Sequence, residues 1–320
     1  MNKGMRIVFM GTPDFAVRSL EILVENGCHV VGVITAPDKP AGRGREMRKS
    51  AVKVFAEKHG LKILQPSNLK DEVFLNELKA LQPDLQVVVA FRMLPEAVWQ
   101  LPAKGTFNLH ASLLPQYRGA APINWAIING ERETGVSTFL IDKEIDTGKI
   151  IFQEKVPISN NDNAGILHDR LMEVGARLVL KTVKTVENGN VPSVPQSELK
   201  GNEVLKPAPK IFRENCQIDW SRGVDELYNF IRGLSPYPAA YTFLVSPEGE
   251  ETQLKIFNVT KELGQARKPG GIETDGKTEL RIAAADGSLL VNELQLAGKK
   301  RMKTGDFLRG FTVSEHWKCQ

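Results

Sequence analysis

Short apolar runs alternate with longer amphipathic stretches along residues 1–189 of the chain. The apolar runs, bounded by turn residues, predict strands at 6–10, 30–34, 63–64, 85–90, 106–110, 136–141 and 150–156. The stretches between them predict helices at 13–27, 50–60, 68–81, 123–128 and 164–186. Strands that alternate with helices of these lengths predict a doubly wound α/β domain with a mostly parallel sheet over residues 1–189.

Local residues indicate where several of these elements begin and how they pair. Thr12 is a candidate N-cap of the first helix, with Pro13 at its first position, where the missing proline N–H costs nothing. Ser50 and Asn68 are the corresponding caps of the next two helices. The run at 150–156 predicts an edge strand that is antiparallel to its predecessor.

Residues 35–49 form a long connection without periodicity, rich in Pro, Gly and Arg. Connections longer than about 12 residues inside a compact domain are usually functional or disordered. Guanidinium groups on such a flexible backbone suit phosphate groups, so a functional loop is the favoured interpretation.

The character of the sequence changes after residue 189. Residues 190–208 carry three prolines among Ser, Gln and Lys and show no periodicity, which predicts a linker. Residues 209–320 then predict a short helix at 224–231, ending at Gly233, and several strands. The strands are expected at 241–244, 253–259, 280–283 and 288–296. A small C-terminal β-barrel (OB-like) is the natural closure for such a set.

Composition and charge narrow the class of protein without identifying it. The chain has 42% hydrophobic and 25% charged residues and a net charge of +4, as a globular protein does. No apolar run reaches the roughly 18 residues of a membrane span, and the N-terminus has no signal-peptide pattern. The three cysteines lie far apart, so neither a disulfide framework nor a metal site is expected, and the expected compartment is the cytoplasm.

Asn108 and His110 stand two residues apart where an apolar strand is expected to end. In an extended backbone, residues i and i+2 point to the same side, so the amide and the imidazole converge. The carboxyl ends of strands are where open α/β sheets bind their ligands. A core histidine beside a turn asparagine is the alternative interpretation.

Two clusters of basic residues are candidate anion-binding surfaces, although each also fits a solvated face. The first is Lys39, Arg43, Arg45, Arg48 and Lys49, and the second is Lys299, Lys300, Arg301 and Lys303. The turn at Gly11 lacks the GxGxxG pattern, so a dinucleotide site has little support.

Five motifs run through both predicted domains: GTPDFA (11–16), TAPDKPAGRGR (35–45), NLHASLLPQYRGAAP (108–122), ETGVSTFLIDKEIDTG (133–148) and IDW (218–220). Together they resemble the methionyl-tRNA formyltransferase family. The resemblance implies transfer of a formyl group from 10-formyltetrahydrofolate to the α-amino group of methionine esterified to initiator tRNA.

The resemblance also implies roles for particular residues. The family's catalytic Asn, His and Asp fall on Asn108, His110 and Asp146, and its folate-contacting segment falls on Ser112, Leu113, Leu114 and Pro115. Arg43 would contact the acceptor end of the tRNA, and Phe15 would line the pocket for the methionyl side chain. The residues expected to bind the tRNA backbone are Lys210, Lys299, Lys300, Arg301 and Lys303. In one departure, Phe91–Leu94 stands where many members have a Tyr-Gly-Leu-Ile type of segment that borders the pterin pocket.

The chemistry of formyl transfer suits these side chains. When an amine attacks a formyl group, negative charge develops on the formyl oxygen, to which Asn108 and His110 can donate hydrogen bonds. The amine must also lose a proton, which a carboxylate such as Asp146 can accept directly or through water. Asp142 competes for this role, but Asp146 fits the family pattern better. No covalent intermediate is required, and no metal is expected.

Other functions remain open at this point. The main rival is a folate-dependent formyltransferase acting on a small amine, such as an amino sugar or glycinamide ribonucleotide. The 35–49 loop, the linker and the second domain argue against it, because a small acceptor needs none of them. A folate-dependent hydrolase and a nucleic-acid-binding protein with a decayed enzyme domain are further alternatives. The expected partners are initiator methionyl-tRNA and the folate co-substrate, with no membrane, and the expected state is a monomer.

Overall fold

The computed structural model describes residues 4–41, 46–201, 204–264 and 268–320. The chain divides into two compact units. The first unit comprises Met1–Gly119, Glu133–Pro157 and His168–Pro207, and the second comprises Ala120–Arg132, Ile158–Leu167 and Ala208–Gln320. Two short segments from the middle of the sequence therefore belong with the C-terminal part.

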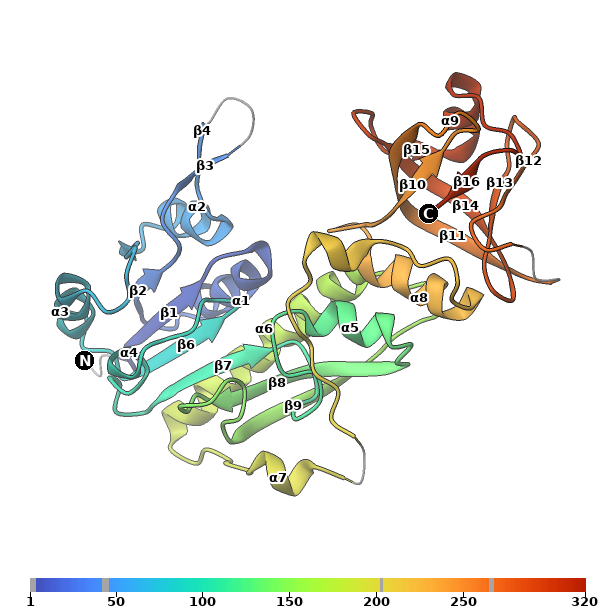
Figure 1. The fold of residues 1–320 in the computed structure, drawn as a ribbon. Helices are drawn as coiled ribbons and strands as arrows, with labels where there is room; N and C mark the ends of the chain where they lie inside the picture. Colours follow the sequence, from blue (N-terminus) through green and yellow to red (C-terminus); the bar gives the residue numbers. More distant parts are fainter. Residues whose placement is uncertain (1–3, 42–45, 202–203, 265–267) are drawn as a thin grey trace. The chain divides into compact units, whose positions relative to one another are not determined.

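The first unit is built on a seven-stranded sheet with the order β5-β2-β1-β6-β7-β8-β9 (Figure 1). The strands are β1 (Ile7–Gly11), β2 (Val30–Ile34), β5 (Ile63–Leu64), β6 (Leu85–Val89), β7 (Thr106–His110), β8 (Glu133–Leu140) and β9 (Ile150–Pro157). The first five strands in this order, from β5 to β7, run parallel to one another. Strand β8 is antiparallel to β7, and β9 is antiparallel to β8. The predicted mostly parallel, doubly wound sheet is confirmed, as is its antiparallel edge strand.

Helices cover both faces of this sheet. On one face, Met10 and Val88 pack with Phe74 of helix α3 (Glu72–Ala80). On the other face, the Thr138 hydroxyl lies 2.9 Å from the Thr182 hydroxyl of helix α6 (Ala164–Asn188). Because both faces are buried, the central strands have almost continuous apolar sequences.

Two of the predicted helix starts are wrong. Helix α1 (Asp14–Glu25) begins after Pro13, and among the described residues no side chain caps it, so Thr12 is not its N-cap. Helix α3 is capped by Asp71 rather than Asn68, because the Asp71 carboxylate accepts hydrogen bonds from N–H groups of the first turn. Ser50 caps helix α2 (Ala51–Lys58), as predicted.

The connection at 35–49 contains a small hairpin rather than irregular chain alone. Strand β3 (Lys39–Ala41) pairs antiparallel with strand β4 (Glu46–Arg48). At its base, Lys53 Nζ donates to Asp38 Oδ2 at 2.6 Å, and this bond holds the pKa of the Asp38 carboxyl below its usual range. The prediction of a connection without secondary structure is therefore wrong in the described part of this segment.

The segment predicted as a linker also has local structure. It contains the short helix α7 (Gln196–Leu199), and Val194 exchanges two backbone hydrogen bonds with Ile150 of β9, at 2.9 and 3.0 Å. Another short helix, α4 (Glu96–Trp99), precedes β7. Helices of this length leave no periodic pattern in the sequence, so neither was predicted.

The second unit contains an antiparallel sheet with the order β12-β13-β14-β11-β10-β16 (Figure 1). Its strands are β10 (Ala240–Val245), β11 (Glu251–Leu263), β12 (Ile272–Thr274), β13 (Leu280–Ala283), β14 (Gly287–Leu296), β15 (Met302–Lys303), which pairs with β14, and β16 (Lys318–Cys319). A bridge between Gly271 and Lys318 joins the two ends of the sheet. The sheet is therefore a nearly closed barrel, which confirms the predicted C-terminal β-barrel.

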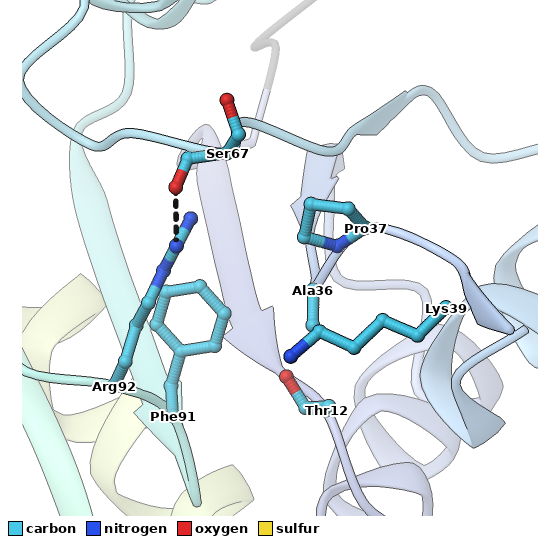
Figure 2. A pocket seen from close by; sticks show the side chains of 7 residues that line it. All are labelled: Thr12, Ala36, Pro37, Lys39, Ser67, Phe91 and Arg92. Atoms are coloured by element: carbon cyan, nitrogen blue, oxygen red, sulfur yellow. Dashed lines mark hydrogen bonds between the residues drawn. The ribbon is translucent and has the colours of Figure 1, made fainter. Parts of the chain in front are cut away.

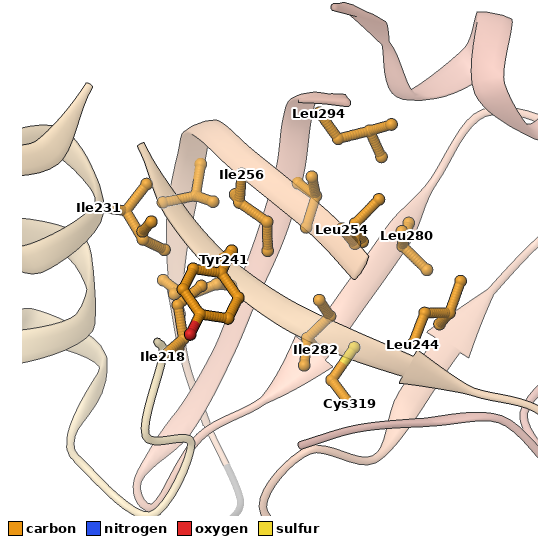
Figure 3. Close-up of a cluster of buried hydrophobic side chains, with 14 of the residues drawn as sticks. Ile218, Ile231, Tyr241, Leu244, Leu254, Ile256, Leu280, Ile282, Leu294 and Cys319 are labelled. Atoms are coloured by element: carbon orange, nitrogen blue, oxygen red, sulfur yellow. The ribbon is translucent and has the colours of Figure 1, made fainter. Parts of the chain in front are cut away.

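Apolar side chains fill the interior of the second unit. Figure 3 shows Ile231 of helix α8 (Val224–Leu234) with Tyr241, Ile256 and Cys319 in one buried cluster. Helix α8 runs one residue past Gly233, so its predicted end is wrong. The unit also contains α5 (Pro122–Ile128), the 3-10 helix η1 (Arg213–Cys216) and α9 (Thr304–Gly310).

Candidate active site

Asn108 and His110 occupy the carboxyl end of β7 on one face of the first unit's sheet. The strand register places Asn108 beside Phe139 of β8 and His110 beside Ser137. Leu114 belongs to the same buried cluster as Phe139, so the chain after β7 folds back over this face. The structure thus gathers the predicted catalytic pair and the predicted folate segment on one side of the sheet.

His110 is buried, and its two ring nitrogens face different partners. Nε2 lies 2.8 Å from the carbonyl oxygen of Tyr117. Because a carbonyl can only accept, Nε2 carries the hydrogen and donates it. Nδ1 lies 3.9 Å from Oδ2 of Asp146. Nδ1 is therefore the nitrogen that can gain or lose a proton, and it faces a carboxylate.

Asp146 is held firmly in the turn between β8 and β9. Its backbone is left-handed, with φ of 55°, which few residues other than glycine adopt. Its Oδ2 accepts a hydrogen bond from Gly119 N at 2.9 Å, and its side chain is 12% exposed. Gly148 can only be glycine here, because an added Cβ would overlap the carbonyl of Leu140. The turn therefore presents one carboxylate to His110.

Asp142, the competing acidic residue, has a different task. Its Oδ1 accepts from the Thr147 hydroxyl at 2.7 Å and from Glu144 N at 3.1 Å. It is exposed and closes the turn from its outer side. Asp146, and not Asp142, lies at ion-pair distance from His110.

Asn108 is half-buried, and its side-chain amide oxygen lacks a hydrogen-bond donor within the described part of the chain. An unsatisfied buried polar atom costs about 1–3 kcal/mol, so it marks a place that an external partner can fill. A carboxamide can present either its oxygen or its N–H groups to such a partner.

Side chains of β8 and β9 fix the backbone of the segment that follows β7. The Ser137 hydroxyl donates to Ser112 O at 2.6 Å and accepts from Leu114 N at 3.1 Å. Gln153 Nε2 donates to Leu114 O and to the Ser137 hydroxyl, both at 2.8 Å. Of the four residues in the predicted folate segment, three are buried and Leu113 is half-buried. The segment is therefore a rigid wall.

A pocket of about 480 Å³ lies at the carboxyl ends of β1, β2 and β6. Figure 2 shows its lining, which consists of Thr12, Ala36, Pro37, Lys39, Ser67, Phe91 and Arg92. Arg92 donates to Ser67 O at 2.9 Å and also to the carbonyl of Pro66, and burial lowers its pKa. Lys39 and Arg92 give the pocket positive charge. Strand β6 separates β1 from β7, so this pocket and His110 lie along the same edge of the sheet.

The structure describes one of the two residues predicted to meet the end of the tRNA. Phe15 is buried in α1, 7% exposed, with its ring edge-on to His168 at 5.2 Å between centroids. Its place in a methionyl pocket stays a prediction. Arg43 lies outside the described residues.

The predicted phosphate-binding residues of the second unit all lie at its surface. They are Lys210, Lys299, Lys300, Arg301 and Lys303. Lys210 Nζ lies 5.1 Å from the centre of the Phe212 ring. Arg301 is already engaged, since it pairs with Glu293 and lies 4.4 Å from the centre of the Phe257 ring.

Residues that hold the site together were missed in the sequence. Gln196 Nε2 donates to the carbonyls of Asp146 and Gly148, at 2.9 and 2.8 Å, and its Oε1 accepts from Arg118. Gln196 lies 50 residues from Asp146 in an aperiodic segment, so no local pattern points to it. The one signal of Ser137 in the sequence is a hydroxyl that stands beside Thr138 among the apolar residues Val136, Phe139 and Leu140.

Within the described ranges, no group of His, Cys, Asp and Glu could hold a metal ion. The three cysteines are free thiols. None of the described helices is long and apolar enough to cross a membrane.

Comparison with protein families gives the class of protein. Residues 5–183 match the model described as formyl transferase, and residues 210–312 match the model described as formyl transferase, C-terminal domain. The first match covers β1 to most of α6, including Asn108, His110 and Asp146. The second covers most of the barrel.

Individual relatives narrow this class. The chain is 58% identical to methionyl-tRNA formyltransferase of Bacteroides fragilis over 99% of its length and 98% of the relative. It is 54% identical to methionyl-tRNA formyltransferase of Flavobacterium johnsoniae over 98% of each chain. The chain therefore belongs to the formyl transferase family, and within it to the methionyl-tRNA formyltransferases.

Solved structures share the fold at low identity. HypX from Aquifex aeolicus in complex with tetrahydrofolic acid matches with a TM-score of 0.65 and 19% identity, over 98% of this chain and 49% of HypX. The sugar 3N-formyl transferase WlaRD, with dTDP and 5-N-formyl-THF, matches with a TM-score of 0.62 and 22% identity, over 92% and 99% of the two chains. The chain spans about half the length of HypX.

Ser137→Ala should loosen the wall after β7. The change removes one donor and leaves Leu114 N and Gln153 Nε2 without their shared acceptor, so we expect a loss of about 1–3 kcal/mol in the free energy of unfolding. Hydrogen exchange of the amide of Leu114 should become faster. Mass spectrometry of peptides that cover 111–117 measures this exchange.

Thr138→Val is the matched control, because Thr138 is a buried hydroxyl of the same strand on the opposite face. It should lower stability without changing exchange at 111–117. Equal exchange in the two variants would show that Ser137 does not hold this segment.

Proposed function

We propose that this protein transfers the formyl group of 10-formyltetrahydrofolate to the α-amino group of methionyl initiator tRNA, in translation initiation in the cytoplasm. The observation that carries the proposal is the His110 imidazole, whose Nδ1 faces Asp146 on the same face as the unsatisfied Asn108 amide. The identity to methionyl-tRNA formyltransferases over nearly the whole chain supports the choice of acceptor.

Asn108 would stabilise the tetrahedral intermediate. The amine nitrogen attacks the formyl carbon, and the carbonyl oxygen becomes an alkoxide. The Asn108 N–H group donates to this oxygen, and a protonated His110 donates from Nδ1, since Nε2 is already bonded to Tyr117 O. Donors held rigidly at such an oxygen are usually the largest single term in catalysis.

Asp146 would handle the proton that the amine releases. After the new C–N bond forms, the nitrogen is an ammonium and must be deprotonated. Asp146 accepts this proton directly or through a water. The proton then passes to the folate nitrogen, while the alkoxide becomes a carbonyl again and the bond from the formyl carbon to that nitrogen breaks. Gly119 N, which donates to Asp146 Oδ2, orients the carboxylate for this step.

Binding of the folate is assigned to the wall beside this group. Ser112, Leu113, Leu114 and Pro115 would contact the folate, and Phe91–Leu94 would border its pterin ring. The wall's backbone is pinned by Ser137 and Gln153, which suits a surface that must hold a donor at a fixed distance.

Binding of the tRNA is assigned to cations on both units. Arg43 would contact the acceptor end, Phe15 would line the methionyl pocket, and Lys39 and Arg92 of the charged pocket lie on the same sheet edge as His110. The surface cations Lys210, Lys299, Lys300, Arg301 and Lys303 would bind phosphates of the tRNA backbone. We propose that the protein acts as a monomer.

Incubation with 10-formyltetrahydrofolate and separate acceptors tests this function. The acceptors are methionyl initiator tRNA, free methionine, glycinamide ribonucleotide and a nucleotide-linked amino sugar. We expect formylmethionine to form only on the tRNA, detected by mass spectrometry after mild hydrolysis of the ester. Formylation of a small amine but not of the tRNA would reverse the assignment, and release of formate without an acceptor would indicate a hydrolase.

Asn108→Ala and Asp146→Ala should each lower kcat by at least about a hundredfold, the usual cost of losing an oxyanion donor or a positioned acid–base group. Steady-state kinetics with charged tRNA measure the change, and thermal melting shows that each variant is folded. A folded variant with nearly full turnover would remove that residue from the catalytic group.

Arg43→Ala should weaken productive use of the tRNA. A plot of log kcat/KM for tRNA against log salt concentration has a negative slope. If Arg43 contacts a phosphate, the variant should make this slope shallower by about one unit. Lys62→Ala, which removes an exposed cation elsewhere in the first unit, is the matched control and should leave the slope unchanged. Unchanged tRNA kinetics in Arg43→Ala at physiological salt would exclude this residue from tRNA binding.

A further inference from the structure

We propose that Gln196 is a positioning residue that holds Asp146 in place beside His110, and that the rate of formyl transfer depends on it. This inference rests on the proposed role of Asp146. Gln196 is the first residue of helix α7, in the segment between the two predicted domains, and it is 4% exposed. A polar side chain so deeply buried needs partners, and it has a complete set.

Every hydrogen-bonding capacity of the Gln196 amide is used. Nε2 donates to Asp146 O at 2.9 Å and to Gly148 O at 2.8 Å. Oε1 accepts from Arg118 Nε at 3.1 Å and from Arg118 Nη2 at 2.7 Å. A carboxamide has two N–H hydrogens and two acceptor positions, so none is left over. The amide cannot rotate or shift without breaking several of these bonds.

The turn that carries Asp146 needs such support. Strand β8 ends at Leu140, which pairs with Phe107, three residues before His110 on the neighbouring strand. The connection must therefore fold back along the sheet face to bring its carboxylate to the imidazole. A left-handed backbone is unfavourable for a residue with a Cβ, and at Asp146 it persists only where the surroundings fix it. Gln196 bonds the carbonyls on both sides of Thr147 and so fixes the turn.

Gln196 also joins the turn to the segment that orients His110. Its second partner, Arg118, lies between Tyr117, which accepts from His110 Nε2, and Gly119, which donates to Asp146 Oδ2. One side chain thus connects the backbone that holds the imidazole with the backbone that holds the carboxylate. Since a displacement of about 1 Å can reduce turnover about a hundredfold, this connection controls the rate.

Gln196→Met tests the proposal, because methionine has nearly the same length but offers none of these hydrogen bonds. We expect kcat to fall by about ten- to a hundredfold while KM for folate and for tRNA changes by less than about threefold. Gln116→Met is the matched control. Gln116 bonds the same aperiodic segment, at Val204 O and Lys206 N, without contacting Asp146, so its kcat should stay within about twofold.

A double-mutant cycle separates positioning of Asp146 from general stabilisation. In an Asp146→Ala background, Gln196→Met should cause little further loss, because the residue through which it acts is gone. An equal loss in both backgrounds, or full activity of Gln196→Met, would overturn the proposal. Thermal melting establishes folding, and Gln196→Asn, with the same amide on a shorter side chain, replaces the methionine variant if that variant does not fold.

The cycle is independent of the identity of the acceptor. The unaltered protein is assayed first, and a failure to formylate methionyl-tRNA would count against the proposed function alone. The cycle is then measured on whichever amine the unaltered protein formylates, so that the role of Gln196 is still decided.

Discussion

The carbonyl oxygen of Tyr117 determines how His110 can act. This oxygen accepts a hydrogen bond from Nε2 of His110. The other ring nitrogen, Nδ1, is therefore the one that can exchange a proton, and it faces Asp146. Tyr117 can turn this carbonyl toward β7 because its backbone is left-handed, with φ of 59°. Two residues later, Gly119 N donates to Asp146. One turn therefore sets the tautomer of the imidazole and the direction of the carboxylate.

The mixed direction of the strands explains why this face holds so many groups. Strand β8 is antiparallel to β7, and β9 is antiparallel to β8, so Ser137 comes into register with His110, and Gln153 comes into register with Ser137. These two side chains bond the chain that leaves β7 and make it a wall beside Asn108.

Hydrophobic patterns predicted most of the fold, because the strands of the first unit are buried on both faces and their apolar runs are hard to mistake. The patterns failed where structure is short or polar. The hairpin of β3 and β4 has three residues in each strand, with Lys, Pro, Glu and Arg among them, and helix α7 is a single turn. Asn68 and Asp71 are equally good caps by residue type, and only the position of the helix decides between them.

The candidate site was likewise predictable only where its signal is local in the sequence. Asn108 and His110 stand out because two residues in a strand share a face, which is a local rule. Asp146 required the resemblance to a family, since its carboxylate reaches His110 only after the turn folds back. Gln196 and Ser137 act through tertiary contacts 50 and 25 residues away in sequence, and no periodicity encodes such contacts.

The segment around α7 is consequently more than a connection between units. Ordering a glutamine side chain costs roughly 1.5–2 kcal/mol in conformational entropy, whereas four internal hydrogen bonds contribute about 1 kcal/mol each. The balance favours docking of Gln196, and backbone bonds from Val194 to Ile150 and from Tyr117 to Lys206 add to it. Because two of the hydrogen bonds of Gln196 fix the carbonyls of the Asp146 turn, docking of this side chain also sets the position of the Asp146 carboxylate.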